Sequence, residues 1–521
     1  MDERSTLDEQ SLSEGGGDLT RKSPGRNGSR MVVNTADSST QVVILGAGPA
    51  GLTAAYELSN LGLGCMVLEQ DTVVGGLART VEHKGFRFDV GGHRFYTKVS
   101  LVQRIWRDIL GDDLLSRKRL SRIYYKSKFF QYPLQPLDAF RGLGPIEAFR
   151  CGLSFVRSRL FPTLPERDFE TWISNRFGRR LFRTFFKSYT EKVWGMDCRE
   201  IAAEWAAQRI KGLSLWSLMR DAVLSQSNKP IKTLIKEFQY PRLGPGMLWS
   251  RMREIVEQRG VTVILNAPLQ GVQLQSGRVL SVRAGNKTYH GQHFISSIPI
   301  RELIEKLEPA PEQCVQAAAA KFRYRDFITV ALMLRGRNLF ADNWIYVHDP
   351  EIRAGRVQNY GNWSPDMTPD SESSCLGVEY FCNASDEIWK ITDEDLIALA
   401  KREMVQLGLV HEQDVIDGAV VRMPKAYPVY DRSYQDALAT VRDFLANVSN
   451  LQLVGRNGMH RYNNQDHSML TAILAARNIA GAQFDLWNLS LDKDYLEAGP
   501  EISTEELAAL EQSQPLVPKT I

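Results

Sequence analysis

The clearest hydrophobic pattern in the chain lies between residues 41 and 69. Four consecutive apolar residues, Val42–Leu45, end directly at Gly46, which is typical of a short buried strand. Apolar residues at helical spacing follow up to Leu58, and a second apolar run covers Cys65–Leu68. The order of these segments predicts a strand, a helix and a second strand, which together form a β–α–β unit.

The middle of the chain changes from strand-like to helical periodicity. A helical pattern covers residues 99–110, and residues 122–134 predict two short strands around the turn at Lys126–Lys128. Residues 137–238 then show mainly helical spacing with few strand signals. Such a run, inserted between two parts that form sheets, predicts a separate helical lobe.

Strand patterns return after Tyr240. A turn rich in Gly and Pro leads to an amphipathic helix and then to alternating strands through Val282. A buried strand near 289–298 is expected to run back to the first β–α–β unit, so the first sheet is discontinuous in sequence.

A second sheet is predicted between residues 320 and 445. Its expected elements are two long alternating strands and one helix, at 329–334, 375–381 and 393–407. The last patterned piece is a strand, Leu451–Val454, which ends at Gly455. A helix of small and apolar residues follows it, and we expect Ser468, or Asp466 just before it, to cap that helix.

Glycines follow the first strand at a spacing that suits phosphate binding. Gly46, Gly48 and Gly51 supply the G-x-G-x-x-G pattern, which allows a tight turn, close backbone approach to a pyrophosphate and close packing of helix on strand. The N-terminus of the next helix offers free N–H groups to phosphate, and Glu69 is placed to accept from a ribose hydroxyl. An ordinary glycine-rich turn is the alternative, but the complete order of strand, turn, helix, strand and acid favours a dinucleotide site.

A second glycine-rich segment specifies which dinucleotide is bound. Residues 75–97 read GGLARTVEHKGFRFDVGGHRFYT, and the pair Gly75–Gly76 lies where the chain folds back over the pyrophosphate. This segment resembles the second signature of two-dinucleotide-binding flavoproteins, the superfamily of amine oxidases, protoporphyrinogen oxidase and UDP-galactopyranose mutase. The resemblance implies that the cofactor is FAD rather than NAD, and that residues 89–93 lie against the flavin ring.

Six blocks are similar to those of UDP-galactopyranose mutases, more to the eukaryotic type than to the usual bacterial one. They are DVGGHRF (89–95), EKVWGM (191–196), EWAAQRI (204–210), GRVQNYGNWSP (355–365), AYPVY (426–430) and RYNNQDHS (461–468). The resemblance implies catalytic roles for His93 and Arg356. The substrate-binding residues that it implies are Trp194, Arg209, Arg356, Tyr427 and Tyr462. The FAD-binding residues expected from the motifs and the resemblance are Gly46, Gly48, Pro49, Ala50, Gly51, Glu69, Gln70, Gly76, Leu77, Ala78, Gly92, His93, Gly455, Gln465, Asp466 and Ser468.

The residue types at these positions favour a polar, anionic substrate. Arginine suits bidentate binding of a diphosphate, and Arg356 is accompanied by Tyr427, Tyr430 and Tyr462. A cavity for an apolar amine or a porphyrin is more often lined by aromatic and aliphatic side chains. Taken singly, an Arg or a Tyr is structural about as often as functional, and a satisfied core histidine is the alternative for His93.

Composition and charge restrict the partners. The 521 residues predict two or three domains, and 43% hydrophobic with 24% charged residues describe a globular protein. A net charge of +3 gives no reason to expect a nucleic-acid partner. The six cysteines are scattered without a C-x-x-C pair, so neither a disulfide framework nor a metal site is expected, and a reducing cytoplasm fits. No run approaches the roughly twenty apolar residues of a transmembrane helix.

One stretch is unusually basic. Between Arg141 and Lys187 there are nine Arg and one Lys against four acids. This excess predicts contact with anionic lipid, and hence peripheral membrane contact, or with an anionic substrate. A solvated helical face is the alternative.

The patterns and the resemblance together predict an α/β fold. It has a discontinuous Rossmann-type FAD-binding domain, a helical insertion, and a second mixed sheet that forms the substrate cavity. The expected parts are a disordered N-terminal tail at 1–40, an FAD-binding domain at 41–98, 240–300 and 450–485, a mainly helical substrate-side domain at 99–239, a substrate-binding sheet domain at 301–449, and a C-terminal tail at 490–521.

Three functions are consistent with these observations. The first, implied by the resemblance, is a flavin-dependent isomerisation of a nucleotide sugar between pyranose and furanose forms, in cell-surface polysaccharide biosynthesis and with an external reductant such as NAD(P)H. The second is an FAD-dependent oxidoreductase of the amine oxidase or protoporphyrinogen oxidase type. The third is a non-catalytic FAD-binding protein at a membrane surface, which uses the basic stretch 141–187.

Overall fold

The computed structural model of the protein describes residues 39–132, 134, 136–203, 237–337 and 339–489. The block at 204–210 and its Arg209, as well as the C-terminal tail expected at 490–521, therefore lie outside the described residues. The N-terminal tail expected at 1–40 also lies outside them, except for its last two residues, which begin the first strand.

The first sheet contains the opening β–α–β unit. Within the described residues it has eight strands in the order β13-β10-β11-β12-β1-β2-β9, with β19 beside β12. Strand β1 runs parallel to both β2 and β12, and β2 runs parallel to β9. The strands are β1 (Ser39–Leu45), β2 (Cys65–Leu68), β9 (Thr262–Ile264), β10 (Leu269–Gln275), β11 (Arg278–Ala284), β12 (Lys287–Ser296), β13 (Leu307–Glu308) and β19 (Leu451–Leu453).

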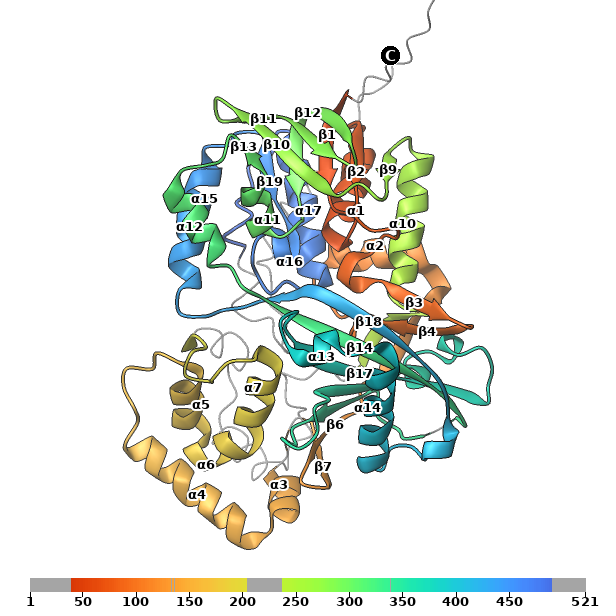
Figure 1. Ribbon diagram of the computed structural model, residues 1–521, viewed down its shortest axis with the longest axis vertical. Helices are drawn as coiled ribbons and strands as arrows, with labels where there is room; N and C mark the ends of the chain where they lie inside the picture. The colour runs from red at the N-terminus through yellow and green to blue at the C-terminus, as the bar shows by residue number, and fades with distance from the viewer. Residues whose placement is uncertain (1–38, 133, 135, 204–236, 338, 490–521) are drawn as a thin grey trace, which may run out of the picture. The chain divides into compact units, whose positions relative to one another are not determined.

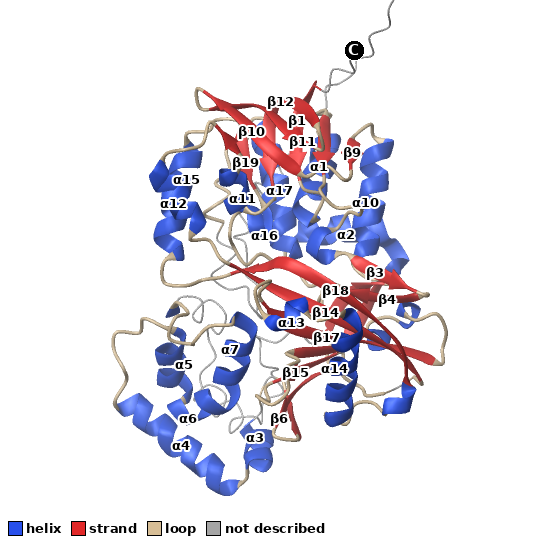
Figure 2. Ribbon diagram, in the orientation of Figure 1, coloured by secondary structure: helices blue, strands red, loops and turns tan. Residues whose placement is uncertain are grey.

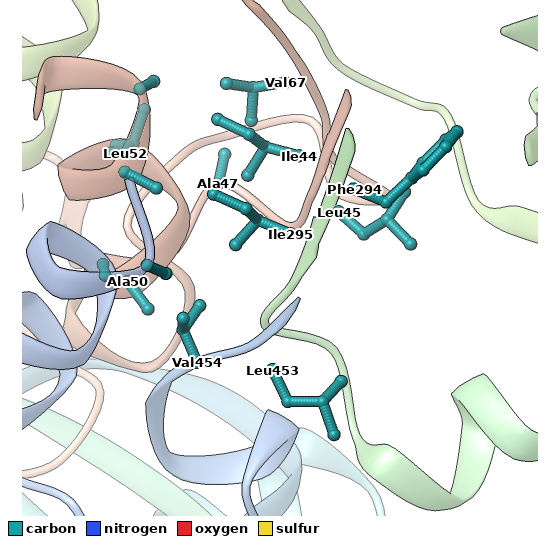
Figure 3. Packing of buried hydrophobic residues seen from close by; sticks show 14 of the residues in the cluster. Ile44, Leu45, Ala47, Ala50, Leu52, Val67, Phe294, Ile295, Leu453 and Val454 are labelled. Carbon is teal, nitrogen blue, oxygen red and sulfur yellow. The ribbon is translucent and has the colours of Figure 1, made fainter. Parts of the chain in front are cut away.

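Helices pack around this sheet (Figure 1). They are α1 (Pro49–Asn60), α2 (Ser100–Leu110), α10 (Gly246–Gln258), α11 (Ile300–Glu305), α12 (Gln313–Ala320), α15 (Tyr434–Ala446), α16 (Gly455–Gly458) and α17 (Gln465–Ile479). The core between them explains the first apolar run, because Ile44 of β1 and Ile295 of β12 are both fully buried. Figure 3 shows these side chains beside Val67 of β2 and Val454, which follows β19. Segments far apart in the sequence thus share one core.

The second sheet has seven described strands in the order β18-β14-β17-β16-β15-β6-β7 (Figure 2). They are β6 (Ser121–Tyr125), β7 (Lys128–Gln131), β14 (Tyr324–Arg335), β15 (Trp344–Val347), β16 (Arg356–Asn359), β17 (Ser373–Cys382) and β18 (Val415–Pro428). Two helices belong to this part of the chain, α13 (Glu387–Lys390) and α14 (Asp393–Gln406).

The central strands of this sheet are longer than predicted and are not half-exposed. The sequence pattern predicted alternation, but β14 is buried continuously from Arg325 to Leu334. One side of β14 packs against Leu396 and other residues of α14, and its other side carries Phe327 and Met333 into two further clusters. Because both faces are covered, the strand reads as an almost continuous apolar run.

Two antiparallel pairs of short strands and a helical group complete the described chain. The pairs are β3 (Thr80–His83) with β4 (Phe86–Asp89), and β5 (Leu114–Lys118) with β8 (Glu237–Pro241). The helical group consists of α3 (Pro136–Leu143), α4 (Pro145–Leu160), α5 (Phe169–Phe177), α6 (Arg179–Leu181), a π-helical turn at Phe182–Lys187, and α7 (Ser188–Trp194).

The predicted fold class is confirmed: two mixed multi-stranded sheets carry helices, and the first sheet is assembled from separate parts of the sequence. The structure differs from the expected helical part at 99–239 in one respect. Helix α2 packs into the core of the first sheet, and β6 and β7 join the second sheet. The local patterns of these elements were correct, but a local pattern does not state which sheet a strand joins.

Candidate active site

One cavity among the described residues is lined by both sheets and by the helical group. Its volume is about 890 Å³, which lies within the usual range of ligand and cofactor sites. The first sheet contributes the glycine turn after β1, the second sheet contributes Trp344 and Arg356, and α7 contributes Tyr189 and Trp194. The cavity is therefore built by all three parts of the chain.

The glycine turn forms one end of this cavity. Gly46 has a φ of +96°, a conformation in which glycine is favoured because it has no Cβ. A Cβ on Gly51 would lie 1.8 Å from the carbonyl oxygen of Gly46, so α1 can pack this closely on the turn only with glycine there. Gly48 and Gly76 also approach each other, since a Cβ on Gly76 would lie 3.2 Å from the Cα of Gly48. The backbone is consequently accessible to a pyrophosphate.

Glu69 lies in the same wall of the cavity and is held by the backbone. Its Oε2 accepts from the N–H of Ala47 at 2.6 Å, and its Oε1 accepts from the N–H of Asp71 at 2.9 Å. These two hydrogen bonds fix the Glu69 carboxylate at the end of β2. In a dinucleotide-binding β–α–β unit, an acid at this position accepts from a ribose hydroxyl.

The histidine loop approaches the second sheet. A Cβ on Gly92 would lie 2.1 Å from the Trp344 ring, and the N–H of Gly92 donates to Oε1 of Glu379 at 3.1 Å. The His93 ring lies with Nε2 3.0 Å from the carbonyl oxygen of Val90. Burial and the nearby Arg456 lower the pKa of His93 to about 4. His93 is therefore a neutral imidazole at neutral pH.

Asp89, at the start of this loop, is held in place by hydrogen bonds to its carboxyl group. The carboxyl group is fully buried and accepts from the hydroxyl groups of Tyr240 at 2.6 Å and Thr80 at 2.9 Å. Burial raises the pKa of Asp89 to about 7, because removing the charged form from water outweighs the two hydrogen bonds.

Arg356 stands at the start of β16 in an aromatic surrounding. Its Nε lies 2.5 Å from Oε2 of the fully buried Glu379 on β17, and its Nη2 donates to the Tyr427 hydroxyl at 2.8 Å. The guanidinium carbon lies 4.5 Å from the centre of the Phe381 ring. Burial opposes the charged form, but the Glu379 carboxylate keeps the pKa of Arg356 well above its ordinary value.

Arg456, on α16, is a second guanidinium group in the same cavity. Its Nε donates to the carbonyl oxygen of Asn463 at 2.9 Å and its Nη1 to that of Ala426 at 3.1 Å. It lies 4.7 Å from the centre of the Tyr462 ring and 5.4 Å from that of Tyr427. Among the described residues Arg456 has no ion-pair partner, so its positive charge is not neutralised by a carboxylate.

Tyrosine rings surround these two arginines. Tyr427 and Tyr462 are stacked with centroids 5.6 Å apart and an interplanar angle of 12°, and Trp194 meets Tyr427 edge-on at 6.5 Å. Tyr430, expected near the substrate, does not line the cavity; its hydroxyl accepts from the N–H of Tyr462 and so holds the backbone of that residue.

The last wall is the N-terminus of α17. The predicted cap is wrong: α17 begins at Gln465, Asn464 occupies the N-cap position, and a reciprocal capping box joins it to His467. The sequence Asn463–Ser468 offers several polar residues, and Ser468 and Asp466 looked equally suitable because both are common capping types. Both instead lie in the first turn and line the cavity.

Unpartnered polar atoms test whether the cavity suits a cofactor. Within the described residues, Gln465 Oε1, Asn463 Nδ2 and Asn457 Oδ1 are buried without a hydrogen-bond partner, and all three residues line the cavity. Buried polar groups are ordinarily satisfied, so these atoms, the glycine turn and Glu69 together fit a large polar ligand such as FAD.

The structure brings nearly all the predicted site residues to this cavity. Those lining it are Gly46, Gly48, Pro49, Ala50, Glu69, Gln70, Gly76, Leu77, Ala78, Gly92, His93, Trp194, Arg356, Tyr427, Gly455, Tyr462, Gln465, Asp466 and Ser468. Gly51 does not line it and acts through packing, and Arg209 lies outside the described residues. The roles assigned to the individual residues remain predictions.

Several lining residues were not expected from the sequence. Arg456, Asn457, Tyr189, Tyr346 and Trp344 all face the cavity. Tyr189 precedes the EKVWGM block by two residues, which is the one local signal for it. Lys192 of that block is structural instead, because its three Nζ–H donors are surrounded by four backbone carbonyl oxygens within hydrogen-bond distance, those of Val347, Asp349, Ile352 and Ala354.

Comparison with known proteins identifies a family of flavin-containing proteins. The profile of the family described as flavin containing amine oxidoreductase matches residues 49–480. Among curated proteins, the chain is 47% identical over 58 residues to inactive all-trans-retinol 13,14-reductase of Danio rerio, which covers 11% of this chain and 10% of the relative. It is 40% identical over 127 residues to L-amino acid oxidase Cdc18 of Crotalus durissus cumanensis, which covers 22% of this chain and 25% of the relative. The matches thus span no more than a quarter of these relatives.

Solved structures share the fold over most of the chain. Reduced UDP-galactopyranose mutase superposes with a TM-score of 0.76 at 21% identity, covering 88% of this chain and 99% of that one. A putative protoporphyrinogen oxidase from Exiguobacterium superposes with a TM-score of 0.67 at 17% identity, covering 84% and 98%. At these identities the likeness describes the fold alone.

Proposed function

The chain belongs to the family of flavin-containing amine oxidoreductases, and from that premise we propose that it is an FAD-dependent enzyme acting on a nucleotide-activated sugar. The proposed reaction interconverts the pyranose and furanose forms of the sugar, as a UDP-galactopyranose mutase does, in the biosynthesis of a cell-surface polysaccharide. An external reductant such as NAD(P)H would keep the cofactor in its reduced form.

The observation that carries this proposal is the pair of cavity-lining guanidinium groups, Arg356 and Arg456, that lie close to Tyr427. Arg356 is neutralised by Glu379, whereas Arg456 has no carboxylate partner among the described residues. The net positive charge beside Tyr427 and Tyr462 suits a diphosphate, which arginine and hydroxyl donors bind through charge-assisted hydrogen bonds. An ammonium group placed there would be repelled by Arg456.

The residues of the chain would have distinct tasks in this reaction. FAD, when bound and reduced, supplies the electron-pair donor for the sugar carbon that carries the diphosphate. Arg356 and Arg456 would stabilise the charge of the departing diphosphate, and the hydroxyls of Tyr427 and Tyr462 would orient it. His93, which is neutral, contributes no charge of its own and would position the flavin ring in the cavity. The aromatic rings would exclude water from the opened sugar.

The test compares the two redox states of the same protein. Purified protein is incubated anaerobically with UDP-galactopyranose before and after chemical reduction, and the sugar nucleotides are separated by chromatography. We expect the furanose form to accumulate only with reduced protein. Equal conversion by oxidised protein, or no conversion in either state with any of a panel of nucleotide sugars, would contradict the proposal.

A second candidate is an FAD-dependent oxidase of an amino acid. The same Arg456 guanidinium suits a substrate carboxylate, and the curated relatives include L-amino acid oxidases. This function predicts steady oxygen consumption and peroxide release with an L-amino acid and without prior reduction. An oxygen electrode therefore separates the two candidates.

A further inference from the structure

Helix α4 carries an apolar face that points away from the rest of the molecule. The face consists of Ile146, Phe149, Leu153, Val156 and Leu160, whose side chains are 70%, 67%, 56%, 52% and 68% exposed. Their spacing of three, four, three and four residues places them on one stripe of the helix. Phe161 and Leu164, which follow the helix, are 76% and 73% exposed, and Phe140 of α3 is 50% exposed. We call these eight residues the α4 face.

This concentration is unusual for the surface of a soluble domain. Within the described residues, eight of the fourteen exposed large hydrophobic side chains belong to the α4 face, although it covers only residues 140–164. Scattered exposed apolar residues need no explanation, but a contiguous patch marks an interaction surface.

The opposite side of α4 packs against the helical group. The exposed apolar face is therefore not the side by which α4 joins the core of this group. Cys151 is buried, Ser154 Oγ accepts from the N–H of Arg180 at 3.0 Å, and a Cβ on Gly178 would lie 2.7 Å from the backbone nitrogen of Phe155. Figure 1 shows α4 along the outer edge of the group formed with α5, α6 and α7. The apolar stripe is therefore held outward by close backbone packing behind it.

Arginines border the stripe on both sides. At 100° per residue, Arg150 and Arg157 follow one edge of the stripe and Arg159 follows the other. All three are exposed, and Arg157 and Arg159 make no ion pair among the described residues. Glu147, the acid of this helix, is partly exposed; its carboxylate accepts from Arg180 Nη2 at 2.7 Å and lies 3.9 Å from Arg150 Nη1. The border of the α4 face thus carries a net positive charge, since Arg157 and Arg159 have no acid partner among the described residues.

We propose that the α4 face docks the protein on the surface of an anionic lipid bilayer. An apolar stripe bordered by arginines suits a helix lying in the plane of the interface, with its side chains among the lipids and the guanidinium groups at the phosphates. The helix does not cross the bilayer: no described helix combines the length and hydropathy of a membrane span. A second copy of the chain is a poorer occupant, since self-pairing of this face would bring Arg157 and Arg159 of both copies together, and like charges repel.

The experiment measures binding of the full-length, FAD-loaded protein to vesicles by flotation. We expect binding to phosphatidylcholine vesicles that contain phosphatidylglycerol to be at least about tenfold tighter than to phosphatidylcholine alone, and to weaken as salt is raised. The double variant Phe149→Asp with Leu153→Asp should lose about tenfold or more of this binding. The variant Arg157→Glu with Arg159→Glu should lose the preference for the anionic lipid.

A matched control carries two aspartates elsewhere. Val405 and Ile416 are exposed by 39% and 46% on α14 and β18, and Val405→Asp with Ile416→Asp should bind vesicles like the wild type. Flavin absorbance confirms that each variant is folded. The proposal is overturned if the wild type binds neither kind of vesicle, or if the variant Phe149→Asp with Leu153→Asp binds as well as the control. It is also overturned if sedimentation shows a dimer that is lost only in the variant Phe149→Asp with Leu153→Asp. These outcomes do not depend on the substrate, so the proposed reaction stands or falls separately.

Discussion

Arg356 and Arg456 face the same cavity, but only Arg356 is paired with a buried carboxylate. Substitution of Arg456 is therefore the clearer test of function. Arg356 is tied to the buried carboxylate of Glu379, so removing it leaves that charge without a partner. Breaking a buried ion pair destabilises the fold by about 3–5 kcal/mol. In an Arg356 variant, weaker binding could therefore result from unfolding alone. Arg456 donates hydrogen bonds to two backbone carbonyl groups and otherwise lies against the rings of Tyr427 and Tyr462, so its removal leaves no carboxylate unpaired.

Arg456→Ala should therefore weaken UDP binding without unfolding the protein. A hydrogen bond to a charged group contributes about 1.5–3 kcal/mol, so the dissociation constant for UDP should rise roughly 10- to 100-fold, as measured by calorimetry on the FAD-loaded protein. Arg253→Ala, which removes a half-buried arginine paired with Glu257 on α10, is the control and should leave the constant unchanged. Unaltered UDP binding in Arg456→Ala would contradict the assignment.

Asp89 should produce a pH dependence of stability. Its pKa of about 7 in the folded protein lies above the ordinary value of 3.8, so the folded state holds a proton that the unfolded chain releases. The wild type therefore loses stability as the pH rises through that interval.

Asp89→Asn does not titrate and should gain stability relative to the wild type over the same interval. Three pKa units correspond to about 4 kcal/mol, which is the upper bound for the change between pH 4 and pH 7. Urea unfolding at several pH values measures it. A difference between variant and wild type that is constant with pH would show that Asp89 ionises in the folded protein as it does in water.

At the level of elements, the sequence predicted local structure well where the physical cause is local. The run Val42–Leu45 and the glycines after it define the strand, the turn and α1, because each depends on neighbours in the sequence. The N-terminus of α17 was misassigned because Asn464 and its partner in the capping box, His467, compete with other good capping residues nearby. Arg456 and Tyr189 were missed because only the folded chain brings α16 and α7 to one cavity.

Two glycine-to-alanine changes test the element-level account. In Gly51→Ala the new Cβ would meet the carbonyl oxygen of Gly46 at 1.8 Å, so α1 must move away from the turn. We expect a loss of about 1–3 kcal/mol in unfolding free energy and weaker retention of FAD. Gly152→Ala, in the interior of α4 with open space at the Cβ position, should instead gain about 0.5–1 kcal/mol. Chemical denaturation measures both, and normal FAD retention in Gly51→Ala would contradict the packing role.

At the scale of the whole molecule, one cavity depends on parts that have separate cores. Its walls come from the first sheet, from the second sheet and from α7, and the corresponding hydrophobic clusters are distinct. A ligand that fills the cavity contacts all of them, and so it stabilises their arrangement as well as each part.

Addition of FAD to protein stripped of flavin should therefore raise the unfolding temperature. Binding that is specific for the folded state contributes about 2.7 kcal/mol when the free ligand is at 100 times its dissociation constant, which corresponds to a shift of several degrees. Differential scanning fluorimetry with increasing FAD measures the shift, and riboflavin, which lacks the pyrophosphate and the adenosine, should give a smaller one. A melting temperature independent of FAD would contradict the cofactor site.

The interleaving of the first sheet also has a consequence for biosynthesis. Strand β1 is among the first described residues, but its neighbour β12 is paired with β19 at Leu451–Leu453, and the wall of the cavity closes with α17 at Gln465–Ile479. The ribosome must therefore have translated the chain as far as α17 before the nascent chain has a complete cradle for the flavin. The cofactor can therefore be held in full only after α17 has been made, and until then the apolar strands of the opening unit are open to aggregation.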